Sequence, residues 1–90
     1  MAEGTPTVSI IIPHWNGIET LSECLDSLKL STYRSFEIIV SDNASTDGSQ
    51  DWLKENHPDV HLLEHDDNYG YAGGCNRGAQ AASGSFLLFL

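Results

Sequence analysis

The chain has 90 residues, with 13 acidic side chains against four basic ones and a formal net charge of −9. This acidic balance disfavours nucleic acid as a partner, because phosphate backbones need a basic face, and it disfavours electrostatic attachment to anionic lipid. A hydrophobic content of 40% excludes a disordered chain and indicates one small globular domain, or a piece of a larger one.

The start of the chain and its cysteines bear on location. Residues 1–9 contain no basic segment followed by an apolar one, so nothing marks an export signal. No run approaches the roughly 20 apolar residues of a membrane span. Cys24 and Cys75 are far apart and form no CxxC pair, which fits reduced thiols. We therefore expect a cytoplasmic protein, with membrane association of the intact protein left open, and a disordered or tag-like start at residues 1–6.

The first half of the chain alternates between β-rich and helical patterns. The run VSIII at residues 8–12 is continuous and β-branched, and it predicts a strand that Pro13 closes. Residues 17–30 carry leucines at positions i, i+4 and i+7, which is the pattern of a one-sided helix. FEIIV at residues 36–40 predicts a second buried strand.

The second half continues the alternation. Residues 47–57 predict a short helix, which Asp47 would cap and which ends before Pro58. The further predicted elements are a weak strand at 60–65, a small-residue helix at 71–83 and a strand at 85–90. The order β-α-β-α-β-α-β predicts an α/β fold, a doubly wound and mainly parallel sheet with right-handed crossovers and both faces covered. Because no helix follows the last strand, we interpret the chain as the first half of such a domain.

Dense polar clusters follow the predicted strands, at residues 13–17, 41–45 and 66–74. In an open α/β sheet, ligands bind in the crevice beyond the carboxyl ends of the strands. We therefore expect the three clusters to line one ligand crevice. The pair Asn16-Gly17 could also be only a turn before the first helix.

Several of these residues have a simpler structural interpretation. Asp42 could form an Asx-turn with Asn43, but we favour a ligand role because Asp42 is the first residue beyond a buried strand and caps are supplied further on. For Asp47 we favour capping. Trp15 could fill the core, and Glu19 is most simply a first-turn carboxylate that the helix dipole favours.

Several motif classes are disfavoured. GYAGGC is not the dinucleotide fingerprint GxGxxG, and no GxxxxGK[ST] or nucleophile elbow is present. His57, His61 and His65 are spaced at i, i+4 and i+8, but Pro58 and the β-like sequence around them break any helix that could align them on a zinc ion. We expect no metal site among the residues of this chain.

Three motifs together resemble a known family. VSIIIPHWNGIETLSECLDSL, FEIIVSDNASTDGSQDWL and NYGYAGGCNRGAQAASGSFLLFL look like the amino-terminal half of a family 2 glycosyltransferase with the GT-A fold. The resemblance covers residues 7–90 and rests on three motifs in the right order and spacing. It implies strand order 3-2-1-4, and a truncated nucleotide-sugar-binding part of a GT-A domain over residues 7–90.

The resemblance also implies a set of nucleotide-sugar-binding residues. Pro13, Trp15 and Asn16 would flank the nucleoside, and Asp42 would accept a hydrogen bond from the base, typically the N3–H of uracil. Glycines of the third cluster would let the chain pass close under the ligand. The residues in or beside the same family positions, with less defined roles, are Glu19, Asn43, Asn68, Gly70 and Asn76.

By the same resemblance, the intact protein would transfer a sugar from a nucleoside diphosphate sugar, expected to be UDP- or dTDP-linked, to an acceptor hydroxyl. Mg²⁺ or Mn²⁺ would be held by a DxD-type motif beyond Leu90, and the catalytic base would lie further on, so we expect this chain alone to be inactive. The alternative is a non-catalytic nucleotide-binding α/β module. The uncharged apolar strand at 85–90 also predicts self-association through its edge.

Overall fold

The computed structural model describes residues 6–31 and 35–90. The expected disordered start lies almost entirely outside the described residues. The elements in chain order are β1 (Val8–His14), α1 (Ile18–Lys29), β2 (Phe36–Asp42), α2 (Ser49–Asn56), β3 (His61–Glu64), α3 (Gly70–Ala81) and β4 (Phe86–Phe89).

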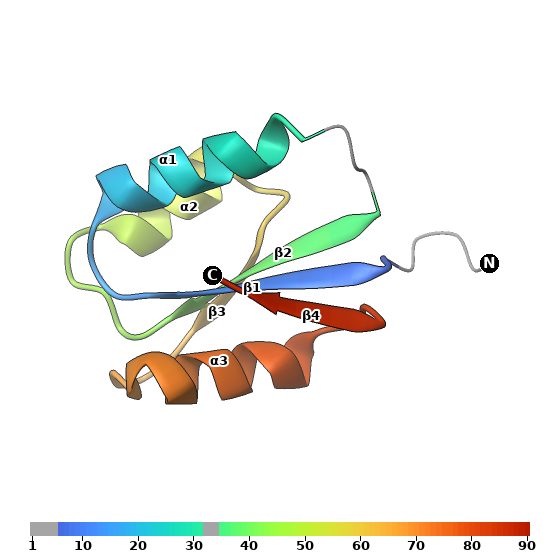
Figure 1. The fold of residues 1–90 in the computed structure, drawn as a ribbon. Coiled ribbons are helices and arrows are strands. Elements are labelled where there is room, and N and C mark those ends of the chain that lie inside the picture. The colour runs from blue at the N-terminus through green and yellow to red at the C-terminus, as the bar shows by residue number, and fades with distance from the viewer. Residues whose placement is uncertain (1–5, 32–34) are drawn as a thin grey trace.

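The four strands form one sheet of order β3-β2-β1-β4, in which every neighbouring pair is parallel. Helices α1 and α2 cover one face of the sheet, and α3 covers the other (Figure 1). This arrangement confirms the predicted α/β class, the doubly wound layering and the strand order. It also brings the carboxyl ends of β1, β2 and β3 to the same end of the sheet, where the polar clusters follow.

The two faces of the sheet are packed differently. Under α1 and α2, alternate strand residues meet the helix leucines in one apolar cluster, whose buried members are Ile10, Ile12, Leu21, Leu25, Ile38, Val40, Leu53 and Val60. The intervening residues Ile11 and Ile39 are fully buried on the face that α3 covers. There α3 carries small residues, which seat its backbone close to β1.

Strands β1 and β2 both run two residues further than predicted, since their pairing continues from Pro13 with Ser41 to His14 with Asp42. Pro13 does not end β1, because β4 pairs only with Val8 to Ile11 on the other side. Beyond that point the missing N–H of proline removes no ladder hydrogen bond. The extension carries the strand ends directly into the polar loops.

The connection into β4 is fixed at the opposite end of the sheet by the carboxylate of Glu37. Its Oε2 accepts hydrogen bonds from Ser9 Oγ at 2.5 Å and from the Ser83 backbone N–H at 2.7 Å. Burial alone would raise the pKa of Glu37, but these hydrogen bonds outweigh it and hold the pKa below its ordinary value. The Gly84 N–H adds a 2.8 Å bond to Ser9 Oγ, so the start of β4 is tied to β1.

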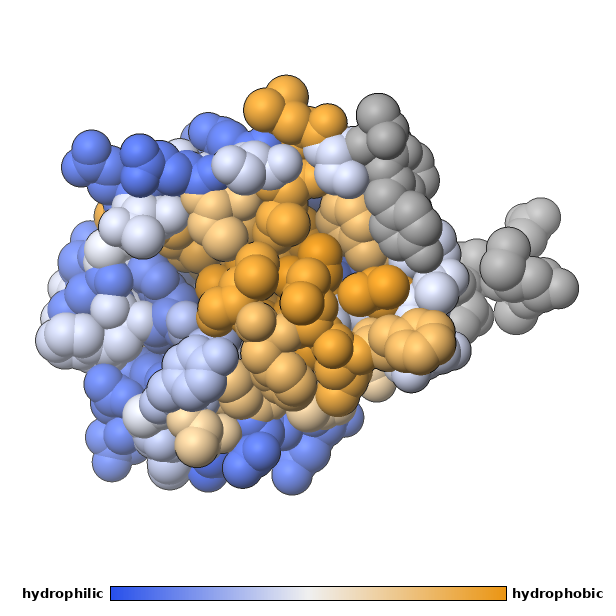
Figure 2. All heavy atoms as spheres, in the orientation of Figure 1, coloured by the Kyte–Doolittle hydropathy of each residue, from blue (hydrophilic) through white to orange (hydrophobic). Residues whose placement is uncertain are grey.

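Strand β4 itself is apolar and uncovered. All four of its side chains are exposed, from 41% at Phe89 to 66% at Phe86. Figure 2 shows apolar side chains gathered across the middle of the face on which β4 lies. Among the described residues β4 pairs only with β1, so its outer edge carries free backbone groups. No helix in the described part of the chain is long and apolar enough to cross a membrane.

Candidate functional site

A hollow of about 280 Å³ lies at the carboxyl ends of the strands. It is formed where the loops after β1 and β2 meet the beginning of α3. The residues that line it are Pro13, His14, Trp15, Asn43, Asn68, Gly70 and Tyr71. Five of the nine residues predicted to bind a nucleotide sugar therefore meet at one place, which we call the crevice.

Aromatic side chains stand at the mouth of the crevice. Trp15 is 53% exposed and Tyr71 is 63% exposed. Trp15 is therefore not the core filler that its size allowed, and its indole has no hydrogen-bond partner among the described residues. Exposed aromatic rings beside a hollow are suited to stack on a flat ligand.

Asn43 forms the floor of the crevice and joins three segments of the chain. Its backbone N–H donates to His14 O at 2.8 Å, and its side-chain Nδ2 donates to Gly70 O at 3.1 Å. Its Oδ1 accepts the Tyr69 N–H at 3.3 Å. Only 3% of Asn43 is exposed. The amide thus sets where α3 begins relative to β1 and β2.

The close approach of α3 depends on a glycine. A Cβ at Gly74 would lie 2.9 Å from Pro13 Cβ and 3.1 Å from Asn43 Nδ2, so a side chain there would push the helix off the strand end. We expected the glycines of this segment to make room for a ligand. At Gly74, the space that a side chain would need is filled by Pro13 and Asn43, not by a ligand.

Asp42 is fully buried, and its carboxylate is bound by the loop after β2 and by the first turn of α2. Oδ2 accepts the Ser45 N–H at 2.9 Å and Gln50 Nε2 at 2.7 Å, while Oδ1 accepts Ser45 Oγ at 2.6 Å. The partners are Ser45 and Gln50, not the Asn43 of the Asx-turn that we had set second to a ligand role. A carboxylate can accept about four hydrogen bonds, so some capacity is left for a donor that reaches it.

Asn16 ties the loops after β1 and β2 to each other. The Asn16 N–H donates to Ser45 Oγ at 2.9 Å, and Asn16 Oδ1 accepts the Thr46 N–H at 2.8 Å. Asn16 adopts a left-handed backbone conformation with φ 51°, which asparagine tolerates better than most residues. These bonds hold the loop that carries Trp15, the chain neighbour of Asn16.

Asp47 extends this tie to the start of α2. Its Oδ1 accepts the Ser49 N–H at 3.0 Å and also accepts the Ser49 hydroxyl, and its Oδ2 accepts the Gly17 N–H at 2.6 Å. The Ser49 hydroxyl bond is the main cause that lowers the pKa of Asp47 to about 2. Asp47 thus binds the first N–H of α2, as predicted for a cap, although it lies one residue before the N-cap position at Gly48.

His14 links the end of β1 to the same Ser49 hydroxyl. Its Nε2 lies 3.0 Å from Ser49 Oγ, and only 9% of the residue is exposed. Burial lowers the pKa of His14, although the charges of Asp42 and Asp47 act in the opposite direction. Sequence reasoning left this imidazole without a role, because its partner is 35 positions away along the chain.

Four of the nine predicted site residues do not line the hollow, namely Asn16, Asp42, Glu19 and Asn76. Glu19 is exposed in the first turn of α1, the position that its simpler helix-dipole interpretation expects. Asn76 is exposed on α3, and neither residue lines the hollow. Tyr71 was missed as a site residue, although it is an aromatic residue within the third polar cluster.

The loop before α3 carries a further cluster of charged and aromatic groups. The Arg77 guanidinium lies 3.5 Å above the Tyr69 ring, and the Tyr69 hydroxyl donates to Asp66. His65 packs edge-on to Tyr69, and its pKa is lowered by burial and then by Arg77. No group of three or more His, Cys, Asp or Glu that could hold a metal ion is found in residues 6–31 and 35–90. The family resemblance implies Mg²⁺ or Mn²⁺ ligands beyond Leu90, so the described residues do not test that prediction.

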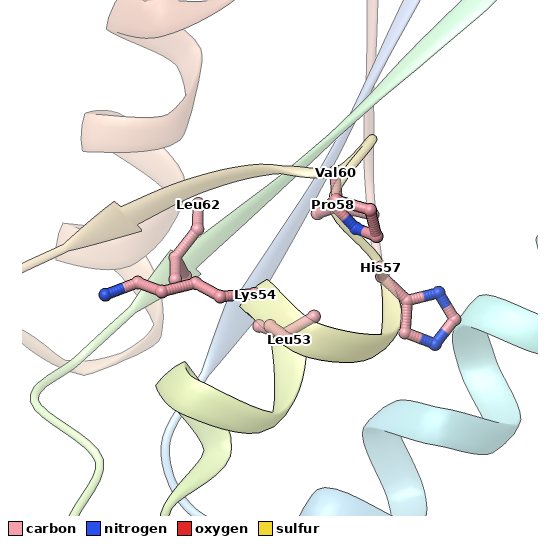
Figure 3. Close-up of a pocket in the computed structure, with 6 residues that line it drawn as sticks. All are labelled: Leu53, Lys54, His57, Pro58, Val60 and Leu62. Atoms are coloured by element: carbon pink, nitrogen blue, oxygen red, sulfur yellow. The ribbon is translucent and has the colours of Figure 1, made fainter.

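A second hollow, of about 170 Å³, lies between the end of α2 and β3 (Figure 3). It is lined by Leu53, Lys54, His57, Pro58, Val60 and Leu62. His57 Nδ1 lies 2.9 Å from Lys29 Nζ, and the His57 ring centroid lies 5.2 Å from that of Trp52. Each of the two tryptophans thus stands near a different hollow, Trp15 at the crevice and Trp52 here.

The structure is an α/β domain with a hollow at the carboxyl ends of its parallel sheet, where open α/β sheets bind ligands. The sequence profile described as "Glycosyl transferase family 2" matches residues 9–90. The chain belongs to this family, as its motifs indicated.

Relatives and solved structures agree with this assignment. The chain is 37% identical over 93 residues to "Uncharacterized glycosyltransferase YibD" of Escherichia coli (strain K12), which covers all of this chain and 27% of that protein. It is 36% identical to "PGL/p-HBAD biosynthesis glycosyltransferase" of Mycobacterium tuberculosis, over 94% of this chain and 34% of that one. The chain spans between a quarter and about a third of the length of these relatives.

Among solved structures, the chain resembles "Mannosyltransferase PcManGT from Pyrobaculum calidifontis in complex with GDP-Man and Mn2+", with a TM-score of 0.81 and 30% identity. That match covers 94% of this chain and 27% of the mannosyltransferase. It also resembles S. aureus TarS 1-349, with a TM-score of 0.84 and 26% identity over 93% of this chain and 26% of that one. The fold is therefore the amino-terminal portion of a GT-A glycosyltransferase.

Proposed function

We propose that this chain is the nucleoside-binding part of a nucleotide-sugar-dependent glycosyltransferase, and that the crevice receives the nucleoside of the donor. In the intact protein, the donor sugar would pass from a nucleoside diphosphate to an acceptor hydroxyl. The observation that carries the proposal is the exposed Trp15 ring beside a hollow whose floor, Asn43, is held by three hydrogen bonds. A rigid floor lowers the entropic cost of placing a base, and the exposed ring offers a face on which the base can stack.

The mannosyltransferase with bound GDP-Man and Mn2+ supports a nucleotide sugar as the class of ligand. We propose a uridine or thymidine nucleotide as the donor, with Asp42 accepting the N3–H of the base. Asp42 is fully buried and does not line the hollow, so a base would reach its carboxylate by displacing the Ser45 bonds. Asn68 would hold the sugar side of the nucleoside, while Asn16, Glu19 and Asn76 would act only indirectly, since all three lie outside the hollow.

Titration of the isotope-labelled chain with nucleosides, followed by NMR, tests the proposal. We expect uridine to shift the Trp15 indole signal and to leave the Trp52 indole unchanged, with millimolar affinity, about −4 kcal/mol. Trp15→Ala should weaken binding by about 1–3 kcal/mol, the range for losing a base stacked on an aromatic ring. A shift at Trp52 instead would place binding in the second hollow, and guanosine binding more tightly than uridine would contradict the uridine or thymidine assignment.

A modified ligand tests Asp42. 3-Methyluridine lacks the N3–H, so the chain should bind uridine more tightly than 3-methyluridine by about 1.5–3 kcal/mol, the range for a hydrogen bond to a charged group. Asp42→Ala, which has no side-chain acceptor, should abolish this preference. A preference that is unchanged in a folded Asp42→Ala chain would remove Asp42 from the base-reading role.

We also propose that the 90-residue chain alone does not catalyse transfer. The described residues hold no metal-binding group, and the chain spans only part of the length of its relatives. Incubation with a panel of nucleotide sugars and Mn²⁺ should yield neither hydrolysis nor transfer. Turnover by this chain would overturn the proposal. A nucleoside-binding module without catalysis is the remaining alternative, which transferase activity of the intact protein would exclude.

A further inference from the structure

Three side chains form a continuous line of hydrogen bonds beneath the crevice. His14 Nε2 lies 3.0 Å from Ser49 Oγ, the Ser49 hydroxyl donates to Asp47 Oδ1, and Asp47 Oδ2 accepts the Gly17 N–H at 2.6 Å. A serine hydroxyl has one proton, and here it points to Asp47. Ser49 Oγ must therefore accept from His14, which places a proton on Nε2 of the imidazole.

This line begins and ends on either side of Trp15. His14 is the last residue of β1, and Gly17 precedes the first residue of α1. Between them, Asn16 is held by Ser45 and Thr46 of the neighbouring loop. The Trp15 ring itself is 53% exposed and makes no hydrogen bond in the described part of the chain. The position of the ring thus depends on how its chain neighbours are held.

We propose that His14 is a positioning residue for nucleoside binding, which acts through Ser49 and Asp47 to hold the Trp15 loop in the conformation that binds the base. The inference rests on the proposed function of the crevice. It assigns His14 no contact with the ligand, although the residue lies at the wall of the hollow. The proposal also explains why β1 ends in a buried histidine, since its ring reaches from the strand end to Ser49 at the start of α2.

Glutamine and phenylalanine at position 14 separate positioning from packing. The side-chain nitrogen of glutamine stands as many bonds from Cα as Nε2 of histidine, so His14→Gln can still donate to Ser49. His14→Phe keeps the ring but loses the donor. Because one hydrogen bond is worth about 1 kcal/mol, we expect uridine to bind roughly fivefold more weakly to the Phe variant and to recover in the Gln variant.

Ser49→Ala interrupts the same line at its centre. It should weaken uridine binding about as much as His14→Phe, and the double variant should be no weaker than either single one, because the two changes break one pathway. His57→Phe is the matched control, since His57 is also 9% exposed but lines the second hollow. It should leave uridine affinity unchanged.

Amide exchange at Gly17 gives a measurement that needs no ligand. Its N–H donates to Asp47, so exchange should accelerate in the Phe and Ala variants and stay slow in His14→Gln. Equal uridine affinity of the Phe and Gln variants would overturn the proposal. Additive losses in the double variant would overturn it too, since direct ligand contact by His14 predicts that result. If no nucleoside binds the unmodified chain, the proposed function fails, while Gly17 exchange still decides whether His14 holds the loop.

Discussion

Replacing Gly78 by alanine tests how closely α3 is seated on the sheet. A Cβ at this position would lie 2.5 Å from Ile11 Cγ2 and 3.1 Å from Ile11 Cγ1. Carbon atoms in favourable contact are about 3.5–4.0 Å apart, so α3 would have to lift by roughly an ångström. Ile11 cannot retreat, because it is fully buried, β-branched and paired to strands on both sides.

Two effects of opposite sign set the magnitude. Overpacking a core costs about 1–3 kcal/mol, whereas alanine in place of glycine within a helix stabilises by about 1 kcal/mol. Because the contact at 2.5 Å is so short, we expect overpacking to dominate, with a net loss of about 1–2 kcal/mol in the free energy of unfolding. For a chain of this size the melting temperature should fall by roughly 4–16 °C.

Urea unfolding followed by circular dichroism measures the change, with Asn76→Ala and Asn76→Gly as the matched pair. Asn76 is exposed in the same helix, so this pair reports the helix propensity difference without the clash. Adding Ile11→Leu, which moves the methyl branch away from the β-carbon, should recover part of the Gly78→Ala loss. If Gly78→Ala is as stable as the unmodified chain while the Asn76 pair behaves normally, the inferred seating of α3 is wrong.

Further predictions concern pH, charge and assembly. Burial lowers the pKa of His14, so the unfolded chain binds more protons than the folded chain once the pH falls below about 6.5. The free energy of unfolding should therefore decline below that pH, and it should decline less in His14→Gln. An identical pH dependence of the urea midpoints of both chains would contradict this. The pKa of Asp47 is lowered to about 2, so the folded chain should lose further stability as the pH falls below about 4, the ordinary carboxyl value. Asp47→Asn should remove this loss from the acid unfolding curve. Without metal, UDP should bind the −9 chain no more tightly than uridine, since like charges repel; tighter UDP binding in calorimetry would refute this. The exposed strand Phe86–Phe89 should drive self-association, and Leu88→Lys should reduce it; light scattering that finds a monomer at high concentration would rule it out.

The fold was predictable because its strands are uninterrupted apolar runs and its helices are one-sided. Their order along the chain, with short connections, leaves few arrangements other than a parallel sheet. The boundaries were less predictable. Pro13 was taken as the end of β1, and only the short reach of β4 explains why the strand continues past it.

The place of the crevice was also predictable, since it follows from where parallel strands end. Its internal bonding was not, because it depends on residues about 30 positions apart that two loops bring together, such as Asn16 with Thr46. Asp42 shows the same difficulty at short range. Asp42 lies at a strand end, and Ser45 follows three residues later. The sequence pattern does not show whether the Asp42 carboxylate binds Ser45 or a ligand, and in the structure it binds Ser45.

The central position of β1 has a consequence for synthesis of the chain. Its pairing with β2 can form as soon as residue 42 has left the ribosome, but its other edge must wait for Phe86 to emerge. At about 5–20 residues per second, that edge stays unpaired for a few seconds, with Ser9 and Ile11 lacking their strand partner. A nascent chain held at this stage is a three-stranded sheet that is open to a chaperone or to a second ribosome-bound copy. Synonymous codons between residues 42 and 86 would therefore influence yield through their translation speed alone.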